Sequence, residues 1–172
     1  MRNPYDELPE VPSFTLTSQD IDNGERKPLV HASSMVGGQD VSPQLSWSDF
    51  PAETKGFVVT VYDPDAPTAS GFWHWAVAGL PADVTELAQD AGALNSEKLP
   101  AGAFQLRNDA GQARYMGAAP PEGHGKHHYY VVVHAVDTDD LGIDANATPA
   151  YLGFNLFAHT IARATMIVWY ES

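Results

Sequence analysis

An aspartate at the end of an apolar segment could bind a ligand or transfer a proton. Asp63 closes residues 57–63, a run rich in β-branched and aromatic residues that stops at Pro64. Side chains in a strand repeat every two residues, so Asp63 shares a face with apolar neighbours. A carboxylate on such a core-side face needs a partner. We therefore expect Asp63 to be paired, whereas Asp65 is expected to lie in a solvated turn.

His74 could be that partner. It lies near the start of residues 72–79, which are apolar on both faces and predict a central strand. If this strand pairs with the preceding one, Asp63 and His74 meet at one end of the sheet. Alternation assigns Trp73 and Trp75 to the opposite face. A structural core histidine explains the pattern equally well, so both interpretations stay open here.

His127 and Tyr129 begin a third strand, residues 127–137, and share one face because they are two positions apart. The rest of that face is apolar, and polar groups confined to a strand end are typical of a pocket mouth. The alternative explanation is that His127 and Tyr129 are simply exposed to solvent at the end of the strand. His128 points to the opposite face. Asp63 beside either His74 or His127 would favour the imidazolium.

The remaining chemistry-bearing residues give no cofactor signature. His124, His127 and His128 form a dense cluster, for which a fortuitous metal site is the less favoured interpretation. His159 has no second histidine four residues away on its expected helix, and the chain has no cysteine. Phosphate-binding and dinucleotide-binding glycine motifs are missing, as is a serine nucleophile elbow. We expect neither a metal ion nor an organic cofactor.

Composition narrows the classes of partner. The chain has 172 residues and a net charge of −13, with nine scattered Lys and Arg. Nucleic-acid binding requires clustered cations, and acidity disfavours anionic membranes. No apolar stretch is long enough to span a bilayer, and the N-terminus lacks the apolar core of a secretory signal. We expect one cytoplasmic domain, with residues 1–12 as a surface arm.

The elements that must position these residues are mostly strands. Further short strands are expected at 13–18, 29–31, 45–47 and 166–170, with a helical turn near 83–87. Thr148 and Pro149 suit the cap and first position of a helix over 149–164, with Leu152, Leu156, His159 and Arg163 along one stripe. Strands with one late helix predict an all-β, β-dominated sandwich.

Four stretches resemble the phosphatidylethanolamine-binding protein family, specifically its prokaryotic Raf-kinase-inhibitor-like branch. The central two are YDPDAP at 62–67 with GFWHW at 71–75, and GAAPPEG at 117–123 leading to HHY at 127–129. SPQLSW at 42–47 and YLGF at 151–154 agree as well. The resemblance covers nearly the whole chain, from about residue 14 to residue 170.

This resemblance implies a large antiparallel sheet packed on a smaller one, with a C-terminal helix and a pocket for phosphate-like anions. The pocket residues that it implies are Asp63, Pro67, His74, Pro121, His127 and Tyr129. His128 stands where the family usually has Arg. Because His128 points away from the pocket face, we expect the pocket to survive and the opposite surface to differ.

Three functional hypotheses follow. The first is a binding or regulatory module for a small phosphate-like anion, in which imidazolium groups at His74 and His127 supply positive charge. The second is a hydrolase that uses an Asp/His acid–base pair on an ester or phosphoester. The third is an inhibitory module that acts on a kinase or protease, although no particular protein partner is indicated. We favour binding because no nucleophile or metal cage is evident.

Exposed aromatic surface and four tryptophans also predict a homodimer.

Overall fold

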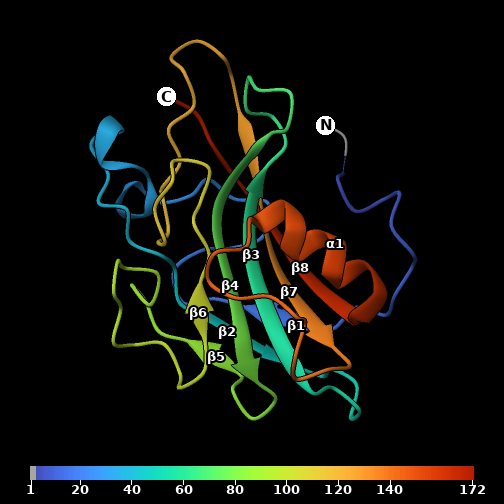
Figure 1. The fold of residues 1–172 in the computed structure, drawn as a ribbon. Coiled ribbons are helices and arrows are strands. Elements are labelled where there is room, and N and C mark those ends of the chain that lie inside the picture. Colours follow the sequence, from blue (N-terminus) through green and yellow to red (C-terminus); the bar gives the residue numbers. More distant parts are fainter. Residues whose placement is uncertain (1–2) are drawn as a thin grey trace.

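The computed structural model describes residues 3–172, which form eight strands, one α-helix and two short 3₁₀ helices (Figure 1). In chain order the elements are β1 (Thr15–Thr17), η1 (Leu29–His31), η2 (Ser34–Val36), β2 (Leu45–Ser48), β3 (Gly56–Asp63), β4 (Phe72–Pro81), β5 (Glu86–Leu87), β6 (Phe104–Gln105), β7 (His127–Val136), α1 (Pro149–His159) and β8 (Thr160–Tyr170).

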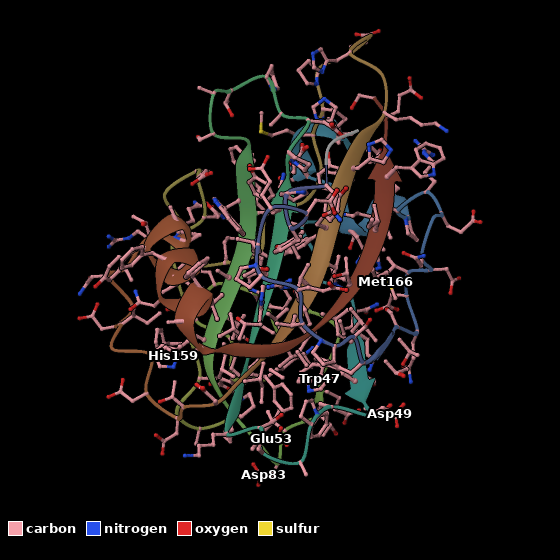
Figure 2. The ribbon with its side chains drawn as sticks, turned by 90° about the vertical axis from the view of Figure 1, so that its right-hand side faces the viewer. Trp47, Asp49, Glu53, Asp83, His159 and Met166 are labelled. Carbon is pink, nitrogen blue, oxygen red and sulfur yellow. The ribbon has the colours of Figure 1, made fainter. Side chains whose placement is uncertain are left out.

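The strands form two sheets, as expected. The large sheet has the order β6-β4-β3-β7-β8, the small sheet has the order β1-β2-β5, and their strand pairs are antiparallel. Figure 2 shows α1, ending at His159, on one side of the large sheet and Trp47 of the small sheet on the other. The three central strands of the large sheet are therefore covered on both faces, which explains their nearly continuous apolar sequences.

The main hydrophobic core lies between the two sheets. Phe57, Val59 and Val61 of β3 face it and pack with residues such as Trp47 of β2. This confirms that Asp63, two positions further along β3, lies on the core-side face. A second, smaller core on the opposite face contains Val58, Leu152 and Leu156, so α1 is anchored by two leucines one turn apart.

A β-bulge changes the expected alternation in β4. The register between β3 and β4 passes from Val61 opposite Trp75 to Tyr62 opposite Trp73, which leaves His74 as an extra residue. The extra residue brings Trp75 to the same side of the sheet as His74, where Trp75 is buried in the main core. The prediction that Trp73 and Trp75 share the face opposite His74 is therefore wrong for Trp75.

The late helix is shorter than predicted. Thr148 caps it, with its hydroxyl accepting from the Tyr151 amide at 3.1 Å, and Pro149 occupies the first turn as expected. The helix ends at His159 rather than at residue 164, and β8 starts at once and pairs with β7 along its length. Arg163 therefore lies on a strand. Pairing with β7 satisfies backbone groups that a longer helix would have satisfied internally, and the β-branched residues of 160–168 suit a strand.

Two other short predictions are corrected. Residues 29–31 form η1 rather than a strand, because Pro28 and the hydrogen bond from Ala32 N to the Leu29 carbonyl close a tight turn. The helical turn expected near 83–87 is replaced by β5, whose two residues pair with β2. Met1 and Arg2 of the expected arm lie outside the described residues. In residues 3–172 no helix has the length and hydropathy needed to cross a bilayer.

Candidate functional site

All six candidate residues line one cavity of about 190 Å³ at the end of the large sheet. β3 supplies Asp63, the following turn Pro67, β4 His74, the glycine-rich loop Pro121, and β7 both His127 and Tyr129. The other lining residues are Ala66, Thr68, Phe72, Met116, Ala119 and Pro120. Antiparallel pairing of β3 with β4 and β7 brings these strand ends together, as the sequence pattern predicts.

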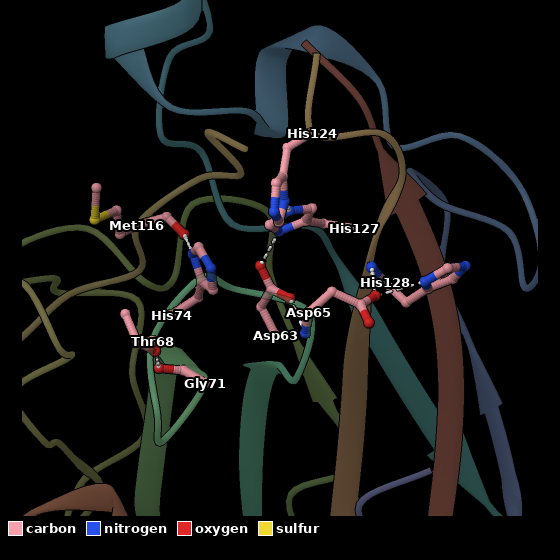
Figure 3. A network of polar contacts seen from close by, with 9 residues as sticks. All are labelled: Asp63, Asp65, Thr68, Gly71, His74, Met116, His124, His127 and His128. Carbon is pink, nitrogen blue, oxygen red and sulfur yellow. Dashed lines mark hydrogen bonds and ion pairs between the residues drawn. The ribbon is translucent and has the colours of Figure 1, made fainter. Parts of the chain in front are cut away.

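Asp63 is held by two donors at the buried base of this site. The Nδ1–H of His127 donates to Oδ2 at 2.8 Å, and the amide of Asp65 donates to Oδ1 at 2.8 Å (Figure 3). Burial raises the pKa of Asp63, although the hydrogen bond from His127 opposes the shift. Of the two histidines considered as its partner, His127 is the one bonded to Asp63, and it is also buried.

The second ring nitrogen of His127 is also engaged. Its Nε2 lies 2.6 Å from Nδ1 of His124, on the exposed loop before β7 (Figure 3). Because Nδ1–H of His127 is committed to Asp63, a neutral His127 can only accept at Nε2, and only the imidazolium can donate there. Gly123 and Gly125 flank His124, and both have positive φ, at 75° and 85°. This backbone conformation turns the loop so that His124 reaches His127.

His74 is neutral at physiological pH, contrary to the expected imidazolium. Its Nδ1–H donates to the carbonyl of Met116 at 2.9 Å, and its ring packs edge-on against Tyr129. Burial lowers the pKa of His74 to about 3, and the positive charge of Lys27 acts in the same direction. His74 therefore shapes the cavity and presents a polar edge without adding positive charge.

Lys27 is a buried cation that sequence reasoning missed. Its side chain is 2% exposed, and its Nζ lies 4.0 Å from the centre of the Tyr129 ring and donates to the Tyr115 hydroxyl at 3.4 Å. Burial lowers the pKa of Lys27 to about 7, while Asp63 opposes the shift. The protonated amine therefore places a positive charge directly behind a cavity wall. Turn-rich residues 19–56 have no periodicity that could have indicated its direction.

Tyr129 contributes a hydroxyl that has no internal partner. The residue is fully buried, and its OH forms no hydrogen bond with any of residues 3–172. Buried polar groups are nearly always satisfied, so an unpaired hydroxyl in a cavity wall requires a binding partner such as a ligand or ordered water. The Tyr129 ring packs beside His74 and over the amine of Lys27, so its hydroxyl is a donor in a cavity wall that has a positive charge behind it.

Thr68 is the one hydroxyl-bearing residue besides Tyr129 among the lining residues. Its Oγ1 donates to the carbonyl of Gly71 at 2.5 Å and forms no hydrogen bond with a histidine. This hydroxyl is held in the turn between β3 and β4 and is not aligned with a base. The cavity thus has an Asp/His pair but no activated nucleophile.

His128 occupies the opposite face and stabilises the turn after β3. Its amide and its Nδ1 both donate to Oδ2 of Asp65, at 2.8 and 2.6 Å (Figure 3). Asp65 is therefore partnered rather than simply solvated, which corrects the prediction for this residue. His128 also points away from His124 and His127. Among residues 3–172, no three His, Cys, Asp or Glu side chains come together as a metal site.

Comparison with known proteins identifies relatives along nearly the whole chain. A family model described as phosphatidylethanolamine-binding protein matches residues 11–171. UPF0098 protein YbcL of Escherichia coli K12 is 46% identical over 164 residues, which cover 94% of this chain and 90% of that protein. UPF0098 protein YbhB of the same organism is 44% identical over 91% of this chain and 99% of its own.

Solved structures agree with these sequence matches. The crystal structure of E. coli YbcL, described as a new member of the mammalian PEBP family, has a TM-score of 0.89 and 47% identity, covering 93% of this chain and 99% of that chain. The crystal structure of the PEBP homologue CT736 from Chlamydia trachomatis has a TM-score of 0.78 and 32% identity, covering 93% and 98%.

Proposed function

This chain belongs to the phosphatidylethanolamine-binding protein family, and we propose that it is a non-catalytic binding protein whose cavity accepts the phosphate-like group of a small anion. The observation that carries the proposal is the buried hydroxyl of Tyr129, which lacks a partner among residues 3–172 and belongs to a ring that the buried amine of Lys27 packs over. A hydroxyl donor backed by a cation suits an anionic oxygen.

Local charge is what allows anion binding in a protein with a net charge of −13. The pKa of Lys27 is about 7, so its amine becomes mostly positively charged as the pH falls below that value, and its burial limits screening by solvent. Nδ1 of His127 is bonded to Asp63, so a proton on Nε2 would be the one that the ring can donate to the anion. For the anion to reach Nε2, the ring of His124 must move away from it.

Calorimetric titration with inorganic phosphate at pH 6.5 tests this proposal. Tyr129→Phe removes only the unpartnered hydroxyl, and we expect it to weaken binding about tenfold, which is the usual loss for a hydrogen bond to a charged group. Tyr130→Phe is the matched control, because its hydroxyl is also buried and unpartnered but belongs to the next residue of the same strand, outside the cavity. Equal affinities for wild type and Tyr129→Phe would count against the proposed role of this hydroxyl.

Hydrolysis remains the second candidate because Asp63 and His127 have the geometry of an acid–base pair, with 2.8 Å between Oδ2 and Nδ1. The alternative requires water as the nucleophile, since Thr68 is committed to Gly71. Incubation with p-nitrophenyl phosphate and p-nitrophenyl acetate separates the two functions. Turnover that disappears in His127→Gln would establish an enzyme, whereas binding without turnover supports the proposal.

Modulation of a kinase or another enzyme is a finer form of the same proposal and rests on the family resemblance alone. In that case the bound group would be a phosphorylated side chain of the partner rather than a free metabolite. Competition between inorganic phosphate and a phosphoserine peptide for the Tyr129 cavity distinguishes the two. A peptide that binds only in its phosphorylated form, and that phosphate displaces, would support a protein partner.

A further inference from the structure

A second cavity, of about 270 Å³, lies on the face of the large sheet opposite the anion site. Its walls are the N-terminal arm, α1, and the outer face of β3 and β4, which lie together in Figure 1. Most of the lining side chains are aromatic or aliphatic: Pro4, Tyr5, Leu8, Pro9, Val11, Tyr62, Trp73, Pro149, Leu152, Leu156 and Phe157. A small cavity with such walls suits an apolar body of one or two rings.

Three buried polar atoms of residues that line this cavity have no hydrogen-bond partner in the described chain: the Tyr5 hydroxyl, Nδ1 of His134 and Nε of Arg163. His134 of β7 is 4% exposed, and its Nε2 lies 3.1 Å from Oγ1 of Thr60, while its Nδ1 has no partner in the described chain. Burial lowers the pKa of His134 to about 3, so the ring is neutral. When the hydroxyl of Thr60 donates to Nε2, the ring proton is on Nδ1, which is then a free donor.

Arg163 of β8 supplies positive charge to the same cavity. Its Nε is buried without a hydrogen-bond partner, and its guanidinium lies 5.2 Å from the centre of the Tyr5 ring. Within residues 3–172 no carboxylate forms an ion pair with Arg163. Arg163 is half-buried, and an anionic group of a ligand would pair with its guanidinium and satisfy the buried Nε.

Gly153 keeps one wall of the cavity open. It lies within α1, where glycine is about 1 kcal/mol less favourable than alanine. A Cβ at this position would meet no atom within 4 Å, so packing against the protein does not require glycine. Gly153 is exposed and lines the cavity, so the absence of a side chain here leaves this part of the α1 wall uncovered.

We propose that this second cavity binds a small aromatic monocarboxylate. The carboxylate accepts hydrogen bonds from Arg163 and from Nδ1 of His134, and the ring packs among Tyr5, Trp73 and the apolar face of α1. The apolar walls select the body of the ligand, and the two unpartnered donors select its single acidic group. This site is independent of the anion cavity, because the two lie on opposite faces of the large sheet and share no lining residue.

The test is an NMR titration of the ¹⁵N-labelled full chain with 2-naphthoate, with 2-naphthalenemethanol as the neutral analogue. We expect saturable amide shifts at residues lining this cavity, with a Kd of about 0.1 to 1 mM. The alcohol should bind at least about tenfold more weakly, because it lacks the charge. Saturating inorganic phosphate should leave the naphthoate shifts in place.

Two variants complete the test. Gly153→Leu adds a bulky side chain at a residue that lines the cavity and should raise the Kd, whereas Ala158→Leu, exposed on the same helix and outside the cavity, should leave the Kd unchanged. Arg163→Met should raise the Kd about tenfold or more. The proposal is overturned by shifts that do not saturate up to about 10 mM, by displacement of naphthoate with phosphate, by equal binding of acid and alcohol, or by unchanged binding in Gly153→Leu. Gly153→Leu keeps the proposal testable even if Arg163→Met does not fold.

Discussion

Replacing Lys27 by methionine removes the buried charge behind the anion cavity and nearly preserves the volume of the side chain. The amine lies 4.0 Å from the centre of the Tyr129 ring. A ligand oxygen that accepts from the Tyr129 hydroxyl lies about 5.5 Å from the ring centre, so the two charges are about 8 Å apart. With an effective dielectric constant of about 20, this separation corresponds to about 2 kcal/mol, or about thirtyfold in Kd.

The pKa of Lys27 determines the direction in which anion affinity changes with pH. The pKa of Lys27 in the folded protein is about 7, so the amine is charged below that pH and neutral above it. The groups that face it are His31, Asp63, His74, Tyr115 and Tyr129, and Asp63 is the one acidic carboxyl among them. Anion affinity in the wild type should therefore fall between pH 6 and pH 8.

The assay is calorimetric titration with sulfate, which keeps its charge across this pH range. Wild type and Lys27→Met are compared at pH 6 and pH 8, and Lys126→Met is the control, because Lys126 is an exposed cation that lies over Trp169 outside the cavity. We expect a loss of about thirtyfold in Lys27→Met at pH 6 and a much smaller loss at pH 8. The reasoning is refuted if Lys27→Met and Lys126→Met lose the same affinity, or if the loss in Lys27→Met is independent of pH.

Further predictions concern the cavity, the fold and the assembly. His124→Ala should tighten phosphate binding about fivefold, because the anion no longer competes for Nε2 of His127, and weaker binding would mean that His124 is a ligand itself. Asp63→Asn should weaken phosphate binding about tenfold in calorimetry through loss of the carboxylate that is bonded to the His127 ring, and tighter binding would show that Asp63 mainly repels the anion. Thr148→Ala should lower the free energy of unfolding in urea by about 1 kcal/mol, and an unchanged midpoint would refute the cap. A homodimer stays a prediction that light scattering tests, with a monomer mass as the contrary result.

The aromatic residues that are exposed in the structure are not the tryptophans on which the homodimer prediction rests. Trp47 and Trp75 are buried, and Trp73 and Trp169 are half-buried, so the tryptophans provide little exposed surface. The large exposed aromatic side chains are instead on α1, where Tyr151 and Phe154 stack with ring centres 6.2 Å apart and Phe157 is also exposed. Composition alone could not distinguish these two groups of aromatics, because both occur in apolar surroundings in the sequence.

Local periodicity was sufficient to place most of the candidate site. Asp63 and the pair His127 and Tyr129 follow from the two-residue repeat of their strands, and antiparallel pairing brings them together. The resemblance of the motifs added Pro67 and Pro121, which lie in loops where periodicity carries no information.

The features that escaped prediction depend on contacts between distant parts of the chain. Lys27 is directed inward because its backbone amide bonds to the carbonyl of Trp169, along the edge of β8. The bulge at His74 requires knowledge of the register against β3, which a single strand does not contain. The end of α1 is likewise set by the pairing of β8 with β7, which overrides a local pattern compatible with a longer helix.

The most direct test of anion binding is an NMR titration of the ¹⁵N-histidine-labelled chain with inorganic phosphate at pH 6.5. The account predicts saturable changes at Nε2 of His127, loss of its coupling to the ring of His124, and the same dissociation constant from both signals. It also predicts that the ring of His134, on the other face of the sheet, does not respond. Saturable binding that leaves His127 unchanged, or no saturation up to about 10 mM phosphate, would contradict the proposal that this cavity binds phosphate-like anions.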